Sequence, residues 1–210
     1  MNLSADEIRV LGCLLEKQRT TPDAYPLSLN ALRLACNQST NRDPVADYEE
    51  ADVRDALHRL ERRGFIRLAS GAGSRAAKYR HLLAEALPMD AGEQALMSVL
   101  MLRGAQTPGE LKQRAERMHA FDDLAAVQET LERLIERELV VRLERRPGQK
   151  EERYRQLLEE RALETGEAVA AAPAAQALAP FDELRERVNR LEREVAELRS
   201  AVRDPSSEHV

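Results

Sequence analysis

The sequence predicts a mainly α-helical chain with small β-hairpins, arranged as two similar domains followed by a C-terminal coiled-coil helix. Three observations lead to this prediction. A helix-and-hairpin pattern occurs twice in the 210 residues, further helical patterns precede each copy, and an unbroken heptad pattern occupies residues 181–202. Because aromatic residues make up only 3% of the chain, both cores are expected to be aliphatic.

The internal repeat is clearest where VRDALHRLERRGFIRL (53–68) matches VQETLERLIERELVVRL (127–143). Further along, KYRHLL (78–83) matches RYRQLL (153–158). In each copy, apolar residues at helical spacing predict a helix. Short runs with β-branched residues then predict two strands, and the glycine-containing loop between them has turn chemistry that suits a hairpin.

Polar capping residues mark where the remaining helices are expected to begin. Ser4 and Glu7 have the spacing of a capping box, and Ser28 precedes a second apolar helix pattern. Asp47 and Glu50 predict a capping box for the third helix of the first half. The helices of the second half are expected to begin at three further caps: Asp90, Thr107, and either Asp122 or Asp123.

The order helix, helix, helix, strand, loop, strand is that of a winged helix-turn-helix domain, so the hairpins would be the wings. We expect one such domain over residues 1–87 and a second over residues 88–160. The first helix of each half is apolar nearly all round, at 10–15 and 95–102, so each would be buried on more than one side. These helices are expected to pack the two domains on each other or on a second chain, unless each is simply a central core helix.

The C-terminal region predicts a coiled coil. Residues 161–179 have the Ala- and Pro-rich composition of a linker, residues 180–203 are expected to form the helix, and residues 204–210 are expected to be disordered. Valine at most a positions and leucine at every d position favour a parallel two-stranded homodimer, and the flanking charges agree. The alternative is a single amphipathic helix that docks on its own domain. The residues expected to form the dimer contact are Leu184, Val188, Leu191, Val195 and Leu198.

Charge and composition limit the function. The net charge is −5, so any contact with nucleic acid would have to be local. No metal-ligand spacing, phosphate-binding loop or nucleophile motif is present, so we expect no enzymatic activity, no metal and no cofactor. Two cysteines are too few for a disulfide framework, and no apolar run is long enough to span a membrane, which together predict a cytoplasmic protein.

The first helix-and-hairpin copy is the best candidate for a nucleic-acid interface. Residues 53–81 contain eight basic and two acidic residues. Residues 145–155, around the loop of the second hairpin, are also mainly basic. A charged face that is simply solvated would give the same pattern. Acids at the start of the third helix, from Asp47 to Asp52, would repel phosphate, although helix capping also explains them. The residues expected to contact double-stranded DNA are Arg42, Arg54, Arg59, Arg67, Arg75 and Lys78.

Arg42 lies in the polar segment CNQSTNRDPV (36–45), between the second and third helices. This connection is longer than the three or four residues usual in a helix-turn-helix. Its hydrogen-bonding side chains either form a binding surface or satisfy their own turns.

Three motifs resemble those of the YceH-like family of uncharacterised bacterial proteins: EKQRTTPDAYPLSLNALRLACNQSTNRDPV (16–45), MLRGAQTPGELKQR (101–114) and PGQKEERYRQLL (147–158). The resemblance covers about residues 3–160. It implies a tandem winged-helix fold and supplies no activity or site. The usual NQKSNR of the family is NQSTNR here, and RGPQT is RGAQT.

These observations predict a non-enzymatic, DNA-binding regulatory protein that forms a homodimer. The alternative is a scaffold that uses its winged-helix domains for protein–protein contact. The acidic total and the acidic start of the third helix favour the scaffold, whereas the basic first hairpin favours DNA.

Overall fold

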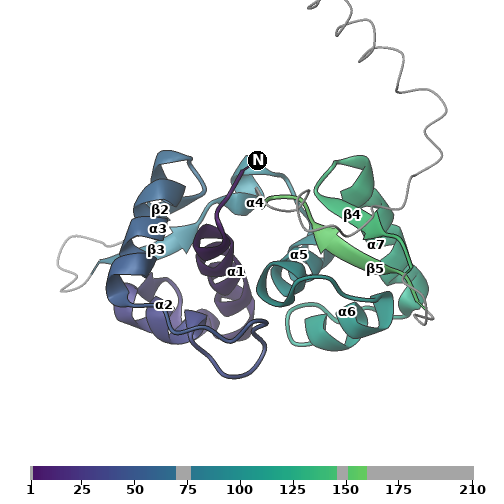
Figure 1. Ribbon diagram of the computed structural model, residues 1–210, viewed down its shortest axis with the longest axis horizontal. Coiled ribbons are helices and arrows are strands. Elements are labelled where there is room, and N and C mark those ends of the chain that lie inside the picture. Colours follow the sequence, from purple (N-terminus) through teal and green to yellow (C-terminus); the bar gives the residue numbers. More distant parts are fainter. Residues whose placement is uncertain (1, 70–76, 146–150, 160–210) are drawn as a thin grey trace, which may run out of the picture. The chain divides into compact units, whose positions relative to one another are not determined.

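The computed structural model describes residues 2–69, 77–145 and 151–159, and within these ranges it is mainly helical with two small antiparallel sheets (Figure 1). The first half contains α1 (Ala5–Thr20), the 3-10 turn η1 (Pro22–Ala24), β1 (Leu27–Ser28), α2 (Leu29–Cys36), α3 (Glu50–Arg62), β2 (Ile66–Leu68), β3 (Lys78–His81) and α4 (Leu83–Ala86). The second half contains α5 (Ala91–Arg103), α6 (Pro108–Ala115), α7 (Leu124–Glu136), β4 (Val140–Leu143) and β5 (Arg153–Gln156). The mainly helical fold with small hairpins is therefore confirmed, while the linker (161–179), the coiled coil (180–203) and the tail (204–210) lie outside the described residues.

Most of the predicted helix starts are confirmed. Ser4 caps α1, and its backbone N–H donates to the carboxylate of Glu7 over 2.8 Å. Four other predicted caps also precede their helices: Ser28 before α2, Asp90 before α5, Thr107 before α6 and Asp123 before α7. The side chains of these four caps each accept a hydrogen bond from a backbone N–H that the first turn of a helix leaves without a partner.

The predicted start of α3 is wrong by two residues. Glu49 is the N-cap and pairs with Asp52, so the capping box does not involve Asp47. The Tyr48 carbonyl explains the difference, because it accepts a hydrogen bond from Asn37 Nδ2 (2.9 Å) and not from a helical N–H. Tyr48 N–H also donates to Asn37 Oδ1 (2.8 Å), which holds residue 48 outside the helix.

The two hairpins have the same register. β2 pairs with β3 so that Ile66 lies opposite His81, and β4 pairs with β5 so that Val140 lies opposite Gln156. β1 adds a third strand to the first sheet in the order β1-β3-β2. Its counterpart in the second half is a single bridge, from Gln106 to Tyr154. The register confirms the internal repeat that the sequence match predicted.

α1 and α5, the first helices of the two halves, pack against each other. A Cβ atom built on Gly12 would lie 3.0 Å from Leu102 Cγ, so glycine allows the helices to approach closely. Ser98 Oγ donates to the Gly12 carbonyl over 3.3 Å. Near the other end of the contact, Arg19 of α1 donates to Gln94 of α5 (3.3 Å), so the helices run in opposite directions. Of the predicted arrangements, the structure has the two halves packed on each other.

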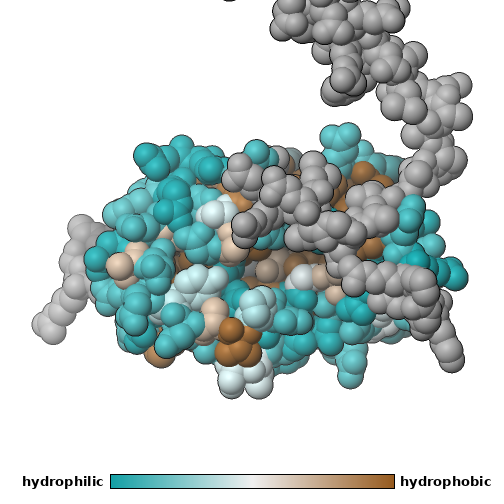
Figure 2. Space-filling view, in the orientation of Figure 1, coloured by the Kyte–Doolittle hydropathy of each residue, from teal (hydrophilic) through white to brown (hydrophobic). Residues whose placement is uncertain are grey.

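The start of the first half is also bound to the end of the second. Leu3 N–H donates to the Leu158 carbonyl over 2.8 Å, and both side chains are buried. Aliphatic residues of both halves form the core, as the low aromatic content predicted. The face shown in Figure 2 is mostly hydrophilic, with scattered hydrophobic residues. Among the helices of the described ranges, none has the length and hydrophobicity needed to cross a membrane.

Candidate nucleic-acid interface

The first sheet gathers basic side chains on one face. Side chains alternate along a strand, and directly paired residues of neighbouring strands share a face. Arg67 of β2 is paired with Arg80 of β3, and Lys78 lies two residues before Arg80, so these three residues share the face opposite the buried pair Ile66 and His81. We call Arg67, Lys78 and Arg80 the basic hairpin face. Two of the six predicted DNA contacts, Arg67 and Lys78, therefore lie together on an exposed surface.

The basic hairpin face carries three cations and one carboxylate contact of Arg80. Arg80 pairs with Glu85 over 3.1 Å, and more than half of that carboxylate side chain is exposed. Arg67 and Lys78 are exposed on the same face. In a chain of net charge −5, this group of three cations is a local concentration of positive charge.

In the second hairpin, carboxylates from several elements pair with the arginines. Arg142 pairs with Glu132 and with Glu152, the latter at 3.6 Å. Arg153 pairs with Glu110 over 3.2 Å and also donates to a backbone carbonyl. Because carboxylates hold both arginines, the second hairpin is a weak candidate for phosphate contact.

Arg54 and Arg59, the predicted contacts on α3, are both held by carboxylates. Arg54 forms an ion pair with Glu50 one turn earlier on the exposed side of α3. Arg59 pairs with Asp6 and lies 3.6 Å from the buried carboxylate of Glu7 on α1. Both guanidinium groups thus have partners within the first half.

The contact of Arg59 recurs in the second half and is therefore part of the repeated architecture. Arg63 joins Arg59 at Glu7, with 3.7 Å between Arg63 Nε and Glu7 Oε1. In the second half, two arginines at the same spacing approach Glu93: Arg133 of α7 at 3.5 Å and Arg137, which follows α7, at 3.2 Å. In each half, the capping glutamate of the first helix anchors the third helix, which assigns Arg59 a structural role.

The prediction that Arg42 contacts phosphate is wrong. Its side chain is fully buried, and its guanidinium donates to both carboxylate oxygens of Glu16, over 3.1 and 2.7 Å. Arg42 Nε also donates to the Ala35 carbonyl over 2.9 Å. Burial opposes ionisation of Glu16, but the hydrogen bonds and charge of Arg42, with a smaller effect of Lys17, hold the Glu16 pKa below its ordinary value. This pair attaches the long connection to α1.

The other polar residues of the connection also satisfy local groups. Gln38 accepts hydrogen bonds from Arg42 (3.0 Å) and from Lys17 (3.3 Å). Arg9 of α1, which the sequence did not single out, donates to the carbonyls of Cys36 (3.0 Å) and Pro44 (2.6 Å). Arg42 and Gln38 therefore hold this connection to α1, and Asn37 holds it to the residues before α3.

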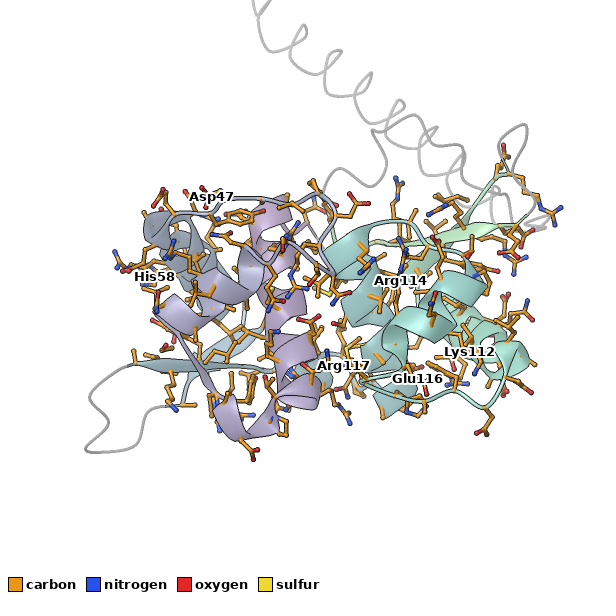
Figure 3. The ribbon with its side chains drawn as sticks, turned by 90° about the horizontal axis from the view of Figure 1, so that it is seen from below. Asp47, His58, Lys112, Arg114, Glu116 and Arg117 are labelled. Atoms are coloured by element: carbon orange, nitrogen blue, oxygen red, sulfur yellow. The ribbon has the colours of Figure 1, made fainter. Side chains whose placement is uncertain are left out.

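The exposed start of α3 is acidic. Figure 3 labels Asp47, which lies before α3, and His58, which lies on α3. Within the described residues from 47 to 55, Arg54 is the single base, whereas five exposed acids are present: Asp47, Glu49, Glu50, Asp52 and Asp55. This end of the helix would repel a phosphate backbone.

Arg75 and the five residues of the predicted dimer contact lie outside the described residues. Within the described ranges, no group of three His, Cys, Asp or Glu side chains is placed to hold a metal ion.

The fold and site thus define a mainly helical protein of two repeated halves, with a basic hairpin in the first. Residues 3–149 match the family described as "Protein of unknown function, DUF480", and the chain belongs to this family. It is 48% identical over 204 residues to the UPF0502 protein of Serratia proteamaculans, covering 94% of this chain and 92% of that protein. It is also 48% identical over 208 residues to the UPF0502 protein YceH of Salmonella paratyphi B and of Salmonella typhimurium, covering 94% of this chain and 93% of each relative. The family resemblance seen in the sequence motifs is confirmed.

Proposed function

We propose that each half is a winged helix-turn-helix domain and that the protein is a non-enzymatic, regulatory DNA-binding protein. The observation that supports this function is the basic hairpin face, where Arg67, Lys78 and Arg80 share one side of the first sheet. The β2–β3 hairpin would be a wing, and its cations would contact the phosphate backbone. Because the start of α3 is acidic, the wing makes the principal contact, and α3 contributes little to base recognition.

This arrangement predicts binding that depends strongly on salt and weakly on sequence. Each phosphate contact releases condensed counterions, so three contacts give a slope of log affinity against log salt of about −3. Replacing one of the three cations should reduce the magnitude of the slope by about 1.

Fluorescence anisotropy with a labelled duplex tests the proposal. The full chain is titrated at several salt concentrations, and Arg67→Gln is compared with Arg145→Gln. Both substitutions remove one exposed arginine, but Arg145 follows β4 in the second half. We expect Arg67→Gln to weaken binding and flatten the slope, and Arg145→Gln to change neither. Equal effects of the two substitutions, or no duplex binding by the wild type at low salt, would contradict the proposal.

The second candidate function is a protein–protein interaction scaffold. The acidic exposed start of α3 favours it, and two exposed aliphatic side chains near that helix, Leu34 and Val45, add apolar surface. A basic or amphipathic partner segment would fit such a surface. In the anisotropy experiment, the scaffold function predicts no duplex binding at any salt concentration.

We propose further that the chain is a homodimer through a parallel coiled coil at residues 180–203, which rests on the heptad pattern alone. Truncation before Phe181 should halve the mass measured by light scattering. A truncated chain with the oligomeric state of the full chain would contradict the coiled coil.

A further inference from the structure

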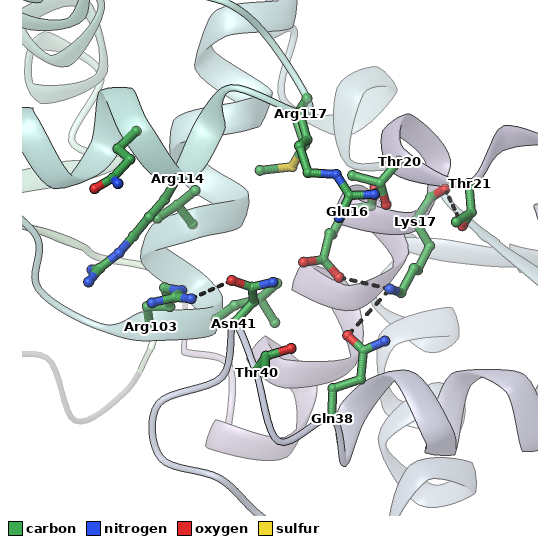
Figure 4. Close-up of a pocket in the computed structure, with 14 residues that line it drawn as sticks. Glu16, Lys17, Thr20, Thr21, Gln38, Thr40, Asn41, Arg103, Arg114 and Arg117 are labelled. Carbon is green, nitrogen blue, oxygen red and sulfur yellow. Dashed lines mark hydrogen bonds and ion pairs between the residues drawn. The ribbon is translucent and has the colours of Figure 1, made fainter.

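A pocket of about 450 Å³ lies where the two halves meet. The first half contributes the end of α1 and the connection after α2, and the second half contributes the ends of α5 and α6 (Figure 4). A volume of this size is in the range of pockets that hold small molecules. The pocket is separate from the basic hairpin face, because it shares no residue with that face.

Four cations line the pocket: Lys17, Arg103, Arg114 and Arg117. Glu16 is the acid among the lining residues, and Arg42 binds both of its carboxylate oxygens from the buried side. The Glu16–Arg42 pair is therefore neutral as a unit. The four cations leave a net positive charge in a chain whose total charge is −5.

Lys17 pairs with Glu16 over 3.4 Å and donates to Gln38, which leaves one of its three N–H donors available to a ligand. Arg103 donates to Asn41 of the connection. Arg114 pairs over 3.4 Å with Glu110, which Arg153 also binds. Arg117 is exposed and makes no hydrogen bond or ion pair with another described residue. Figures 3 and 4 show it on the segment after α6, facing the first half.

The pocket has more positive than negative side chains in its lining. Partial burial, followed by repulsion from Arg114 and Arg42, lowers the pKa of Arg103. A guanidinium group remains protonated at neutral pH even so. An anion placed between these groups would relieve the repulsion, because its charge is opposite to theirs.

Neutral groups complete the lining. Thr40 and Gln113 offer hydroxyl and amide groups near the cations, and Val99, Leu102 and Met118 form an apolar wall. A mixture of several cations, neutral donors and one apolar side suits a small organic molecule with phosphate groups, since guanidinium groups bind phosphate oxygens through paired hydrogen bonds.

We propose that this pocket binds a small phosphorylated molecule whose phosphate groups contact Arg103, Arg114 and Arg117. Lys17 contacts the same phosphates from α1, so the ligand touches both halves at once. The assignment does not depend on DNA binding. If the proposed function also holds, the ligand is placed to act as an effector, because it bridges the half with the basic hairpin face and the half without it.

Isothermal titration calorimetry on the full chain tests the pocket with two probes, inorganic pyrophosphate and adenosine triphosphate, at matched ionic strength. We expect saturable binding of at least one probe, with one site per chain. The Arg117→Gln variant should weaken that binding about tenfold, which corresponds to one charge-assisted contact. Because Arg117 has no partner in the described structure, this substitution should leave folding intact.

The matched control is Arg62→Gln, which removes an exposed arginine on α3, outside the pocket. It should leave the affinity for the probes unchanged. Absence of saturable binding for both probes, or equal weakening by Arg62→Gln and Arg117→Gln, would overturn the proposal. If Arg117→Gln weakened duplex DNA binding and left small-anion binding unchanged, the pocket would be part of a nucleic-acid surface, and the small-molecule assignment would be wrong.

Discussion

Replacing His81 with glutamine is expected to make the folded chain more resistant to mild acid. His81 ends β3 and is only 4% exposed. Its Nε2 lies 2.6 Å from Gln18 Oε1, and its Nδ1 has no hydrogen-bond partner among the described residues. Protonation would place a second, unpaired donor and a charge in this buried position. The equivalent position of the second half is Gln156, so a glutamine already occupies the same place in a paired hairpin.

The magnitude follows from the pKa. Burial, together with Arg80 and Arg19 and against an opposing effect of Glu85, lowers the pKa of His81 from 6.5 to about 4. Between these values the unfolded chain binds a proton more readily than the folded chain, so stability falls as the pH falls. From about pH 7 to about pH 5, this single group should cost about 2 kcal/mol of unfolding free energy. Such a loss is large relative to the ~5–15 kcal/mol by which domains are stable.

Urea denaturation followed by circular dichroism at the two pH values measures this difference. The wild type should lose about 2 kcal/mol more than His81→Gln, because carboxylates such as Glu16 contribute to both chains equally. His58→Gln is the matched control, since His58 is an exposed histidine on α3. The explanation would be refuted if His81→Gln lost as much stability on acidification as the wild type.

Three further predictions concern packing, the buried ion pair and the thiols. Gly12→Val should cost roughly 2 kcal/mol in urea denaturation because the side chain would overlap α5, whereas Gly109→Ala, with open space around it, should be neutral or stabilising. Arg42→Met should cost about 3 kcal/mol by leaving a carboxylate without its buried partner, and a cost near zero would contradict the assigned role. Cys13 and Cys36 are fully buried, so a thiol reagent should modify both only after unfolding, and rapid labelling of the native chain would argue against this packing.

Local signals predicted most of the secondary structure. A capping box needs only a few consecutive residues, so Ser4 and Asp90 were identified correctly. Two overlapping capping boxes fit the sequence before α3, Asp47 with Glu50 and Glu49 with Asp52, and the prediction took the first. The choice between them depends on the hydrogen bonds that Asn37, after α2, makes to Tyr48. The hairpin register could be predicted because two copies of the same pattern confirm each other.

Burial of charged residues was harder to predict. In the sequence, Arg42 is one arginine in a polar loop. Nothing near it indicates that it will be buried in an ion pair with Glu16 of α1. The pocket was missed for the same reason, because its cations come from α1, α5 and the end of α6. Lys17, Arg103 and Arg114 each lie in the last turn of a different helix, and nothing in the sequence shows that these three helix ends meet. By contrast, Arg67 and Lys78 were found because one hairpin brings them together within a short stretch.

The contact between α1 and α5 has a consequence for how this architecture could have arisen. Gly12 and Ser98, which touch across the contact, occupy the same position, eight residues after the caps Ser4 and Asp90. Antiparallel helices that cross at equivalent positions are related by a local two-fold axis, as in a symmetric pair of identical subunits. Duplication and fusion of the gene for one such subunit would place both helices in one chain. The contact would then be intramolecular and would no longer depend on protein concentration. Each copy could then change independently, so that one kept an exposed cationic sheet while the other acquired carboxylates that neutralise its arginines.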